Sequence, residues 1–334
     1  MIILGIESSC DDAAAAVVET ERAGFAIVRA NAVANQDDIH RPYGGVVPEL
    51  ASRNHVLTID PVVQRTLAAA GCELREIDGI AVTRGPGLVG SLLVGLMYAK
   101  GLSQVTSIPM VGVNHLEGHL LAPMLENEVK MPYLALVVSG GHTALFLVDD
   151  FGRYRRLGAT RDDAAGEAFD KVAKLMGLGY PGGKIIDQMA RGGNPNRVRL
   201  PRARVKGAPL DFSFSGLKTA VALFLRSEAA AVTSREDLAA SFQEAVVDML
   251  VRPTIAAARE LDAGTIVLTG GVAANSRLRE RLTEAATAEG RRLVAPSFKY
   301  CTDNAAMIAI AGSYRLLRGE ADPLSLDAEA NLPL

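Results

Sequence analysis

Short hydrophobic runs alternate along the chain with longer segments whose apolar residues are three or four positions apart. Two strands are predicted at Ile2–Glu7 and Ala13–Glu19, where apolar residues run almost without interruption on both sides of a polar turn. The same arrangement returns at Leu134–Val138 and Thr143–Asp149, around a glycine-containing turn. Because strands alternate with helical segments along most of the chain, we expect an α/β fold.

The rest of the chain continues this alternation. A short helix is expected directly after the strand at Met110–Val113, and it carries His115 and His119. Other strands are expected at Ala26–Ala34, Gly79–Thr83, Thr265–Leu268 and Arg292–Ala295. Other helices are expected at Val46–Ala70, Leu88–Val105, Asp163–Leu175, Ser215–Ser227, Glu236–Leu261, Ala274–Ala288 and Asp303–Leu317.

The two strand–turn–strand segments form an internal repeat, because aligning Ser8 with Ser139 sets the turns 131 positions apart. Repeats of that length indicate duplicated domains rather than a solenoid. A chain of 334 residues is also longer than one core usually supports. We therefore expect two related units, with the ligand site in the cleft between them.

Composition restricts the function. The net charge is −3 and Trp is absent, so a nucleic acid must be bound by a local basic patch. The three cysteines, Cys10, Cys72 and Cys301, are too few and too far apart for a disulfide framework or a CxxC zinc site. No apolar run reaches the roughly 18 residues of a membrane span, and the first residues lack the basic segment of a signal peptide. We expect a cytoplasmic protein.

His115 and His119 are the strongest sign of chemistry in the sequence. Histidines four apart share one face of a helix and can bind one metal ion. Glu117 lies two residues after His115, not one as in HExxH proteases, so it points to another side. Asp303 is a candidate third ligand, and the alternative is that it only caps a helix. Two ordinary surface histidines are the other interpretation of the pair.

Several polar turns are candidate ligand sites. Ser139-Gly140-Gly141 follows a strand, and its backbone N–H groups suit a phosphate or carboxylate, although an ordinary hairpin would look the same. Gly270-Gly271 opens a helix beside Asn275, where a flat nucleoside could approach the backbone. Asp170 on a predicted helix could bind ribose hydroxyls, as acidic residues do in nucleotide sites, or be a solvated surface charge.

Two further clusters stay open on sequence alone. Asp11 and Asp12 follow Glu7-Ser8-Ser9 and could orient a metal, a base or an amine, or lie in a solvated turn. Cys10 has no histidine next to it in sequence, which argues against a nucleophile. A basic run with no acid between Asp187 and Asp211 could neutralise phosphates or form a solvated loop. It comprises Arg191, Arg197, Arg199, Arg202, Arg204 and Lys206.

Together these segments resemble one family, the tRNA threonylcarbamoyladenosine transferases called TsaD in bacteria and formerly described as glycoproteases. The matching stretches follow the family order over nearly the whole chain, and the set is far more specific than any one stretch. They are GIESSCDDAAAAVV, HRPYGGVVPELASRNH, RGPGLVGSLLVG, NHLEGHLLAP, LVVSGGHTALF, DDAAGEAFDKVAKLMGLGYPGG, DFSFSGLKTAV, GGVAANSRLRERL and CTDNAAMIA.

The resemblance implies an actin-like fold of the sugar kinase and Hsp70 type. It implies two lobes, residues 1–131 with a C-terminal helix at 304–334, and residues 132–303, with the active cleft between them. It also implies one divalent metal per subunit, Fe²⁺ or alternatively Zn²⁺, on His115, His119 and Asp303. The residues implied for the donor, threonylcarbamoyl-AMP, are Val137, Val138, Ser139, Gly140, Gly141, Asp170, Gly183, Asp187 and Asn275.

The implied reaction transfers the threonylcarbamoyl group to N6 of adenosine 37 in tRNAs that read codons beginning with A. The implied partners are an actin-fold protein (TsaB) and a P-loop ATPase (TsaE). The family commonly has Asp-Glu-Thr after the first cysteine, whereas this chain has Asp11-Asp12-Ala13, so a catalytic role is assigned only to Asp11. The alternatives are an actin-fold ATPase or kinase, and a metalloprotease.

Overall fold

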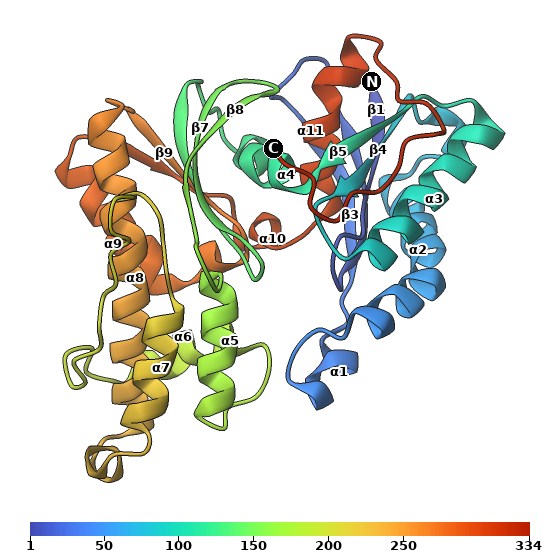
Figure 1. Ribbon diagram of the computed structural model, residues 1–334. Helices are drawn as coiled ribbons and strands as arrows, with labels where there is room; N and C mark the ends of the chain where they lie inside the picture. The colour runs from blue at the N-terminus through green and yellow to red at the C-terminus, as the bar shows by residue number, and fades with distance from the viewer. The chain divides into compact units, whose positions relative to one another are not determined.

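The computed structural model describes residues 1–334. It contains two five-stranded β-sheets, and each sheet packs against its own helices (Figure 1). One compact unit comprises residues 1–129 and 296–334, and the second comprises residues 130–295. The lobe limits implied by the resemblance stay a prediction. They differ from this division mainly at 296–303, a segment that groups with the first unit.

In the first unit the sheet order is β3-β2-β1-β4-β5. Strands β1, β2 and β3 form an antiparallel meander, β4 pairs with β1 in parallel, and β5 pairs with β4 in parallel. The parallel strands need crossover connections, which the helices supply. The strands are β1 (Ile2–Glu7), β2 (Ala13–Glu19), β3 (Ile27–Ala34), β4 (Gly79–Gly85) and β5 (Met110–Asn114).

Helices cover both faces of this sheet. Leu4 and Ile6 of β1 join the core formed with the helix pair α2 and α3, whereas Gly5 between them contacts Ala305 of α11. Alternate residues of a strand face opposite sides, so α11 lies on the other face (Figure 1). The helices are α1 (Asp37–His40), α2 (Pro48–Ala70), α3 (Val89–Thr106), α4 (His115–Leu121), α10 (Phe298–Cys301) and α11 (Ala305–Leu317).

The second unit repeats this plan, with sheet order β10-β9-β6-β7-β8. Its long helix α8 is buried over much of its length. The strands are β6 (Tyr133–Val138), β7 (Thr143–Asp150), β8 (Arg153–Ala159), β9 (Thr265–Thr269) and β10 (Arg292–Val294). The helices are α5 (Ala165–Leu175), α6 (Gly182–Ala190), α7 (Ser215–Phe224), α8 (Arg235–Glu260) and α9 (Ser276–Ala288).

The two sheets have the same topology. In each, three consecutive antiparallel strands are followed by a strand that pairs in parallel with the first of them, and then by a last strand that pairs in parallel with that one. Glu7 at the end of β1 corresponds to Val138 at the end of β6, so the turns aligned in the sequence occupy equivalent places. The expectation of a duplicated α/β fold is therefore confirmed. Five 3₁₀ turns complete the structure, at Arg41–Tyr43, Leu74–Glu76, Ala122–Leu125, Glu228–Val232 and Gly271–Ala274.

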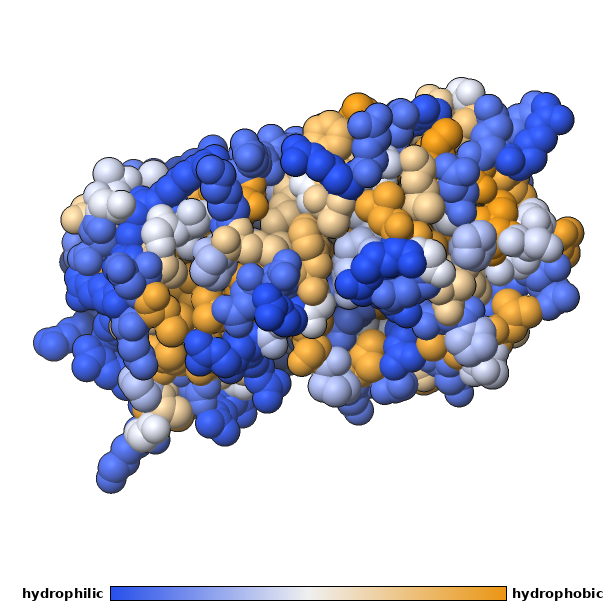
Figure 2. Space-filling model, turned by 90° about the horizontal axis from the view of Figure 1, so that it is seen from above, coloured by the Kyte–Doolittle hydropathy of each residue, from blue (hydrophilic) through white to orange (hydrophobic).

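Four elements were missed by the hydrophobic pattern, and two of them, α1 and α10, are helices of only four residues each. Strand β8 lies at the sheet edge, and its three exposed residues are all arginines, whereas helix α6 begins with Gly182-Gly183, which looks like a turn. No helix is both long and apolar enough to cross a bilayer. Figure 2 shows hydrophobic and hydrophilic residues intermixed on the face that it presents.

Candidate metal centre and ligand site

Helix α4 starts at the end of β5, and Asn114 fixes this start. Its side-chain Oδ1 accepts a hydrogen bond from the N–H of Leu116, as an N-cap residue does. Its Nδ2 donates to the carbonyl oxygens of Leu332 and Pro333 at 3.4 and 3.2 Å. The C-terminal tail therefore helps to position the helix that carries both histidines.

The two imidazoles converge on one carboxylate. Oδ1 of Asp303 lies 3.6 Å from Nε2 of His115 and 3.2 Å from Nε2 of His119. The ligand atoms of the three residues all lie within 4.8 Å of one another. Ligands about 2.1 Å from a tetrahedral metal are separated by roughly 3.4 Å, so the donor set and its spacing fit one metal ion. Both histidines are buried, which excludes the interpretation as surface histidines.

Asp303 is not the cap of the following helix, so that alternative is wrong. Helix α11 is capped by Asn304, whose Oδ1 accepts a hydrogen bond from Met307 N–H at 3.0 Å. Asn304 therefore supplies the hydrogen-bond acceptor that a backbone N–H group at the helix N-terminus requires. The Asp303 carboxylate is thereby left to face the histidines.

Glu7, Ser9 and Thr83 hold His115 in place. Nδ1 of His115 lies 3.1 Å from Glu7 Oε2 and 3.1 Å from Ser9 Oγ, and Thr83 donates to the same Glu7 oxygen at 2.6 Å. A carboxylate on the far nitrogen of a histidine orients the ring and raises its basicity toward a metal. This arrangement directs Nε2 of His115 toward Asp303.

The charges in this cluster are strongly coupled. Burial lowers the pKa of His115, but the carboxylates of Asp303 and Glu7 raise it by more than burial lowers it. The resulting pKa is about 9. Burial raises the pKa of Glu7, yet the His115 cation outweighs it, so this pKa lies below its usual range. His115 is therefore protonated at neutral pH, and a metal ion would have to displace that proton in order to bind.

Glu117 turns away from the histidines, as its position in the sequence predicts. Its Oε1 accepts a hydrogen bond from the hydroxyl of Tyr314 on α11 at 3.2 Å. This contact joins α4 to α11. Glu117 is not oriented to act on a water bound at the histidine pair.

Asp11 and Asp12 lie in the turn between β1 and β2. Burial and the neighbouring Asp11 raise the pKa of Asp12 to about 8, and its Oδ1 accepts a hydrogen bond from Asn35 at 2.9 Å. Burial raises the pKa of the Cys10 thiol, which keeps it protonated and argues against a nucleophile. A histidine does approach Cys10: His55 Nε2 lies 2.8 Å from its carbonyl oxygen, not its sulfur.

In the second unit, the turn after β6 presents open backbone. Ser139 N–H donates to the carbonyl of His142 and closes the turn, but the N–H groups of Gly140 and Gly141 have no protein acceptor. Both glycines are exposed, and a Cβ on either would meet open space. Adjacent free N–H groups of this kind suit an anion.

Helices α5 and α6 are drawn together beside this turn. Gly166 at the start of α5 approaches so closely that a Cβ would lie 2.6 Å from the Ser139 carbonyl oxygen. Asp170, one turn later, accepts a hydrogen bond at 2.7 Å from Gly182 N–H, the residue before Gly183. The atom nearest to a Cβ placed on Gly183 would lie 4.0 Å away, so the space beside this glycine is open.

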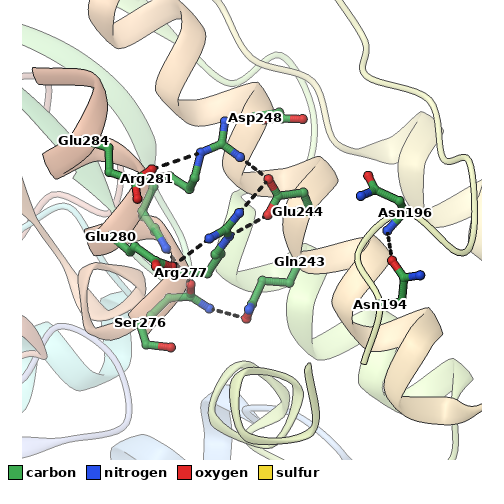
Figure 3. Close-up of polar contacts among 12 residues, drawn as sticks. Asn194, Asn196, Gln243, Glu244, Asp248, Ser276, Arg277, Glu280, Arg281 and Glu284 are labelled. Atoms are coloured by element: carbon green, nitrogen blue, oxygen red, sulfur yellow. Dashed lines mark hydrogen bonds and ion pairs between the residues drawn. The ribbon is translucent and has the colours of Figure 1, made fainter. Parts of the chain in front are cut away.

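Asp187 and Asn275 are linked through the start of α9. Asp187 Oδ1 accepts from both the N–H and the hydroxyl of Ser276, at 3.1 and 2.8 Å. Asn275 caps α9 through Leu278 N–H and donates to Gln243 of α8 at 2.8 Å (the Gln243 side chain is labelled in Figure 3). Each residue therefore has a structural hydrogen bond, which fixes its side chain.

Gly270 completes the contiguous region. Its φ of 94° favours glycine, and a Cβ there would lie 2.4 Å from the carbonyl oxygen of Val138. The strand end that carries Val137 and Val138 is thus packed directly against the turn that leads to Asn275. The nine residues implied for the donor belong to these neighbouring segments of the second unit, whereas Asp11 and the three candidate metal ligands belong to the first.

Sequence reasoning missed the role of Glu7 and Ser9 as supports of His115 and the raised pKa of Asp12. The signal for the first was present, because both polar residues end a strand that is otherwise apolar. No local pattern shows that this strand end lies beside His115. The raised pKa of Asp12 depends mainly on its burial, and the polar residues next to it in the sequence give no sign of that burial.

Solved structures support the fold. The activator of the 2-hydroxyisocaproyl-CoA dehydratase from Clostridium difficile, with bound ADPNP, aligns with a TM-score of 0.56 at 13% identity over 96% of each chain. Full-length HypF, in its phosphate- and nucleotide-bound form, aligns with a TM-score of 0.61 at 13% identity, over 95% of this chain and 55% of HypF. At this identity the likeness shows the fold alone, which is the actin-like ATPase fold.

Sequence relatives specify the family. The proteins named tRNA N6-adenosine threonylcarbamoyltransferase from Syntrophotalea carbinolica and Anaeromyxobacter dehalogenans are 52% and 55% identical. These matches cover 100% and 98% of this chain and 97% and 98% of the two relatives. The model of the TsaD family matches residues 27–310. This chain belongs to the TsaD family, the tRNA N6-adenosine threonylcarbamoyltransferases.

Proposed function

We propose that this enzyme transfers the threonylcarbamoyl group from threonylcarbamoyl-AMP to N6 of adenosine 37 in tRNAs that read codons beginning with A, forming t6A. The observation that carries the proposal is the convergence of His115, His119 and Asp303 in a chain of this family. The exocyclic amine of adenine is a weak nucleophile, so the donor must be an activated acyl group, and a mixed anhydride with AMP is one.

The metal is Fe²⁺ in this proposal, with Zn²⁺ as the alternative, because two imidazoles and one carboxylate suit both ions. When bound, it supplies Lewis-acid stabilisation of an oxygen of the donor. His115 and His119 provide the ligand nitrogens, and Glu7 keeps the His115 ring in its orientation. Asp303 provides the carboxylate from a separate part of the first unit.

The second unit supplies the donor-binding groups. The free N–H groups of Gly140 and Gly141 hold the phosphate or the oxyanion that develops on the carbonyl oxygen when the amine attacks the carbonyl carbon. Loss of one such donor costs roughly 3 kcal/mol of transition-state stabilisation. Val137, Val138 and Ser139 form the rest of the turn, and Asp170, Gly183, Asp187 and Asn275 bind the nucleoside. The fixed hydrogen bonds of Asp187 and Asn275 support this role because they hold both side chains in one position.

The acceptor amine must lose a proton as the new bond to nitrogen forms. We assign this step to the carboxylate of Asp11, which orients the amine and accepts its proton. Asp12 is held by Asn35 instead. The AMP phosphate leaves as the acyl–phosphate bond breaks, so no further co-reactant is needed.

The two other activities are less well supported. An actin-fold ATPase or kinase usually keeps a free acid at the first turn, but the Glu7 carboxylate is engaged by Ser9, Thr83 and His115. A metalloprotease would need Glu117 at the metal, whereas it contacts Tyr314.

Two partners belong to the proposal, a TsaB-like actin-fold protein and a TsaE-like P-loop ATPase. For the first, the structure offers an apolar hollow of about 460 Å³ between α2 and α3. Val56, Leu93 and Met97 are exposed there. An exposed apolar patch of this kind is typical of a protein interface.

The test is incubation of the chain with synthetic threonylcarbamoyl-AMP, the two partner proteins and unmodified tRNA, followed by mass spectrometry of the nucleosides. We expect t6A only when donor and tRNA are both present. His119→Ala should lose bound metal and transfer while the protein stays folded. Full transfer by His119→Ala without metal would refute the assignment, as would steady ATP turnover by the chain alone without t6A.

A further inference from the structure

The basic run of the second unit is anchored to α8 with its charges outward. Val198 N–H donates to Ser241 Oγ at 3.0 Å, and Asn194 N–H donates to Asp237 at 2.7 Å. Val198 and Leu200 are buried, while Arg197 and Arg199, which alternate with them, are exposed. The apolar residues thus fix the segment against the protein and present the arginines to solvent.

Two acids of α8 near this segment, Glu244 and Asp248, are already paired with arginines. Arg277 and Arg281 of α9 both bind Glu244, and Arg281 also reaches Asp248 at 3.3 Å. Figure 3 shows the two arginines directed at the Glu244 carboxylate. The other oxygen of Asp248 accepts from Arg202 at 2.7 Å. Three guanidinium groups therefore share two carboxylates.

The remaining cations have no carboxylate partner. We call them the basic strip: Arg197, Arg199, Arg204, Lys206 and Arg252. None of the five forms an ion pair in the structure. Desolvation and the nearby guanidiniums of Arg204 and Arg202 lower the pKa of Arg252, which shows that like charges crowd together here. An external anion would relieve this repulsion.

We propose that the basic strip binds the phosphate backbone of the tRNA substrate. The inference rests on the proposed function, because it takes tRNA as the acceptor. Guanidinium groups match phosphate oxygens in a two-pronged geometry. The run between Asp187 and Asp211 contains no aromatic residue, so base stacking is not available to it. The strip therefore positions the tRNA without reading its sequence.

The test uses the triple variant R199Q/R204Q/R252Q in the complete complex with its partner proteins. Binding of unmodified tRNA is measured by fluorescence anisotropy over a series of salt concentrations. We expect about tenfold or greater loss of affinity at physiological salt, and a salt dependence whose logarithmic slope is reduced by roughly 2 to 3. The KM for tRNA should rise, while kcat at saturating tRNA should be retained because the reacting groups are untouched.

The matched control is R155Q/R156Q/R226Q. These arginines are also exposed, also lack an ion pair and lie in the same unit, so the control removes equal charge. We expect it to keep the wild-type affinity and salt slope within about twofold, and both variants to keep the wild-type Tm. Equal losses in the two variants, or an unchanged slope in the strip variant, would overturn the proposal. Absence of t6A with the wild-type complex would instead count against the proposed function.

Discussion

Glu7 and His115 lie 108 positions apart in the sequence, yet Glu7 Oε2 lies 3.1 Å from Nδ1 of His115 in the interior of the first unit. Glu7 ends the first strand, and His115 starts the helix after the fifth. Since β1 and β5 both run parallel to β4, their carboxyl ends meet at one edge of the sheet. The edge therefore holds a candidate metal ligand and the carboxylate that orients it.

Glu7→Gln should lower metal affinity by about 10- to 100-fold, the usual effect of losing a carboxylate behind a histidine ligand. The amide keeps the shape of the side chain but lacks the charge that makes His115 more basic. Competition with a fluorescent chelator measures the affinity. Ser9→Ala is the matched control, and it should have a smaller effect because it removes only a neutral contact. Equal effects of both variants would contradict this role of Glu7.

Metal affinity should rise with pH by roughly tenfold per pH unit between about 6.5 and 9, and level off above 9. The reason is that the metal must displace a proton from His115, whose pKa in the folded protein is about 9. Isothermal titration calorimetry across this range measures the dependence. A flat affinity over these pH values would show that His115 is neutral before metal binds.

The same shift predicts the pH dependence of stability without metal. The pKa of His115 in the folded protein lies above its ordinary value of 6.5, so protonation stabilises the native state. This contribution is complete below pH 6.5 and is lost as pH rises through 9. Thermal unfolding in a strong chelator should show Tm falling over this window. The decrease of Tm with pH should be smaller in His115→Gln. An unchanged decrease in that variant would show that other groups cause the pH dependence.

Gly166→Ala should destabilise the protein by about 1 to 3 kcal/mol and weaken donor binding. Its Cβ would lie 2.6 Å from the carbonyl oxygen of Ser139, so the turn or the helix must move. Gly140→Ala is the contrasting variant, since its Cβ meets open space. We expect it to keep its stability and to raise the KM for threonylcarbamoyl-AMP. Urea unfolding and transfer kinetics separate the two effects.

Removing Leu332–Leu334 should weaken metal binding although these residues touch no metal ligand. The deletion removes both carbonyl groups that accept hydrogen bonds from Asn114, which caps the helix carrying His115 and His119. The metal that the deletion variant retains after dialysis measures this effect, and its Tm shows whether the protein stays folded. Removing Leu334 alone leaves both carbonyl groups and is the control. Full metal content in the longer deletion would show that Asn114 needs no support from the tail.

The sequence alone determined the features that depend on near neighbours. The apolar runs at Ile2–Glu7 and Leu134–Val138 predict strands because burial on both faces requires them to be apolar. His115 and His119 share a helix face through the helical repeat, so their partnership was predictable. The 131-residue repeat likewise indicated duplication, which the equal sheet orders confirm.

Only the tertiary structure decided the contacts between distant segments. Asp303 or its neighbour could have capped α11, and the choice of Asn304 depends on how the chain enters that helix. The support of His115 by Glu7 and the crowding of Arg252 with Arg204 follow from sheet order and helix packing. Such contacts form because burying the core brings those segments together, and no short stretch of sequence carries that information.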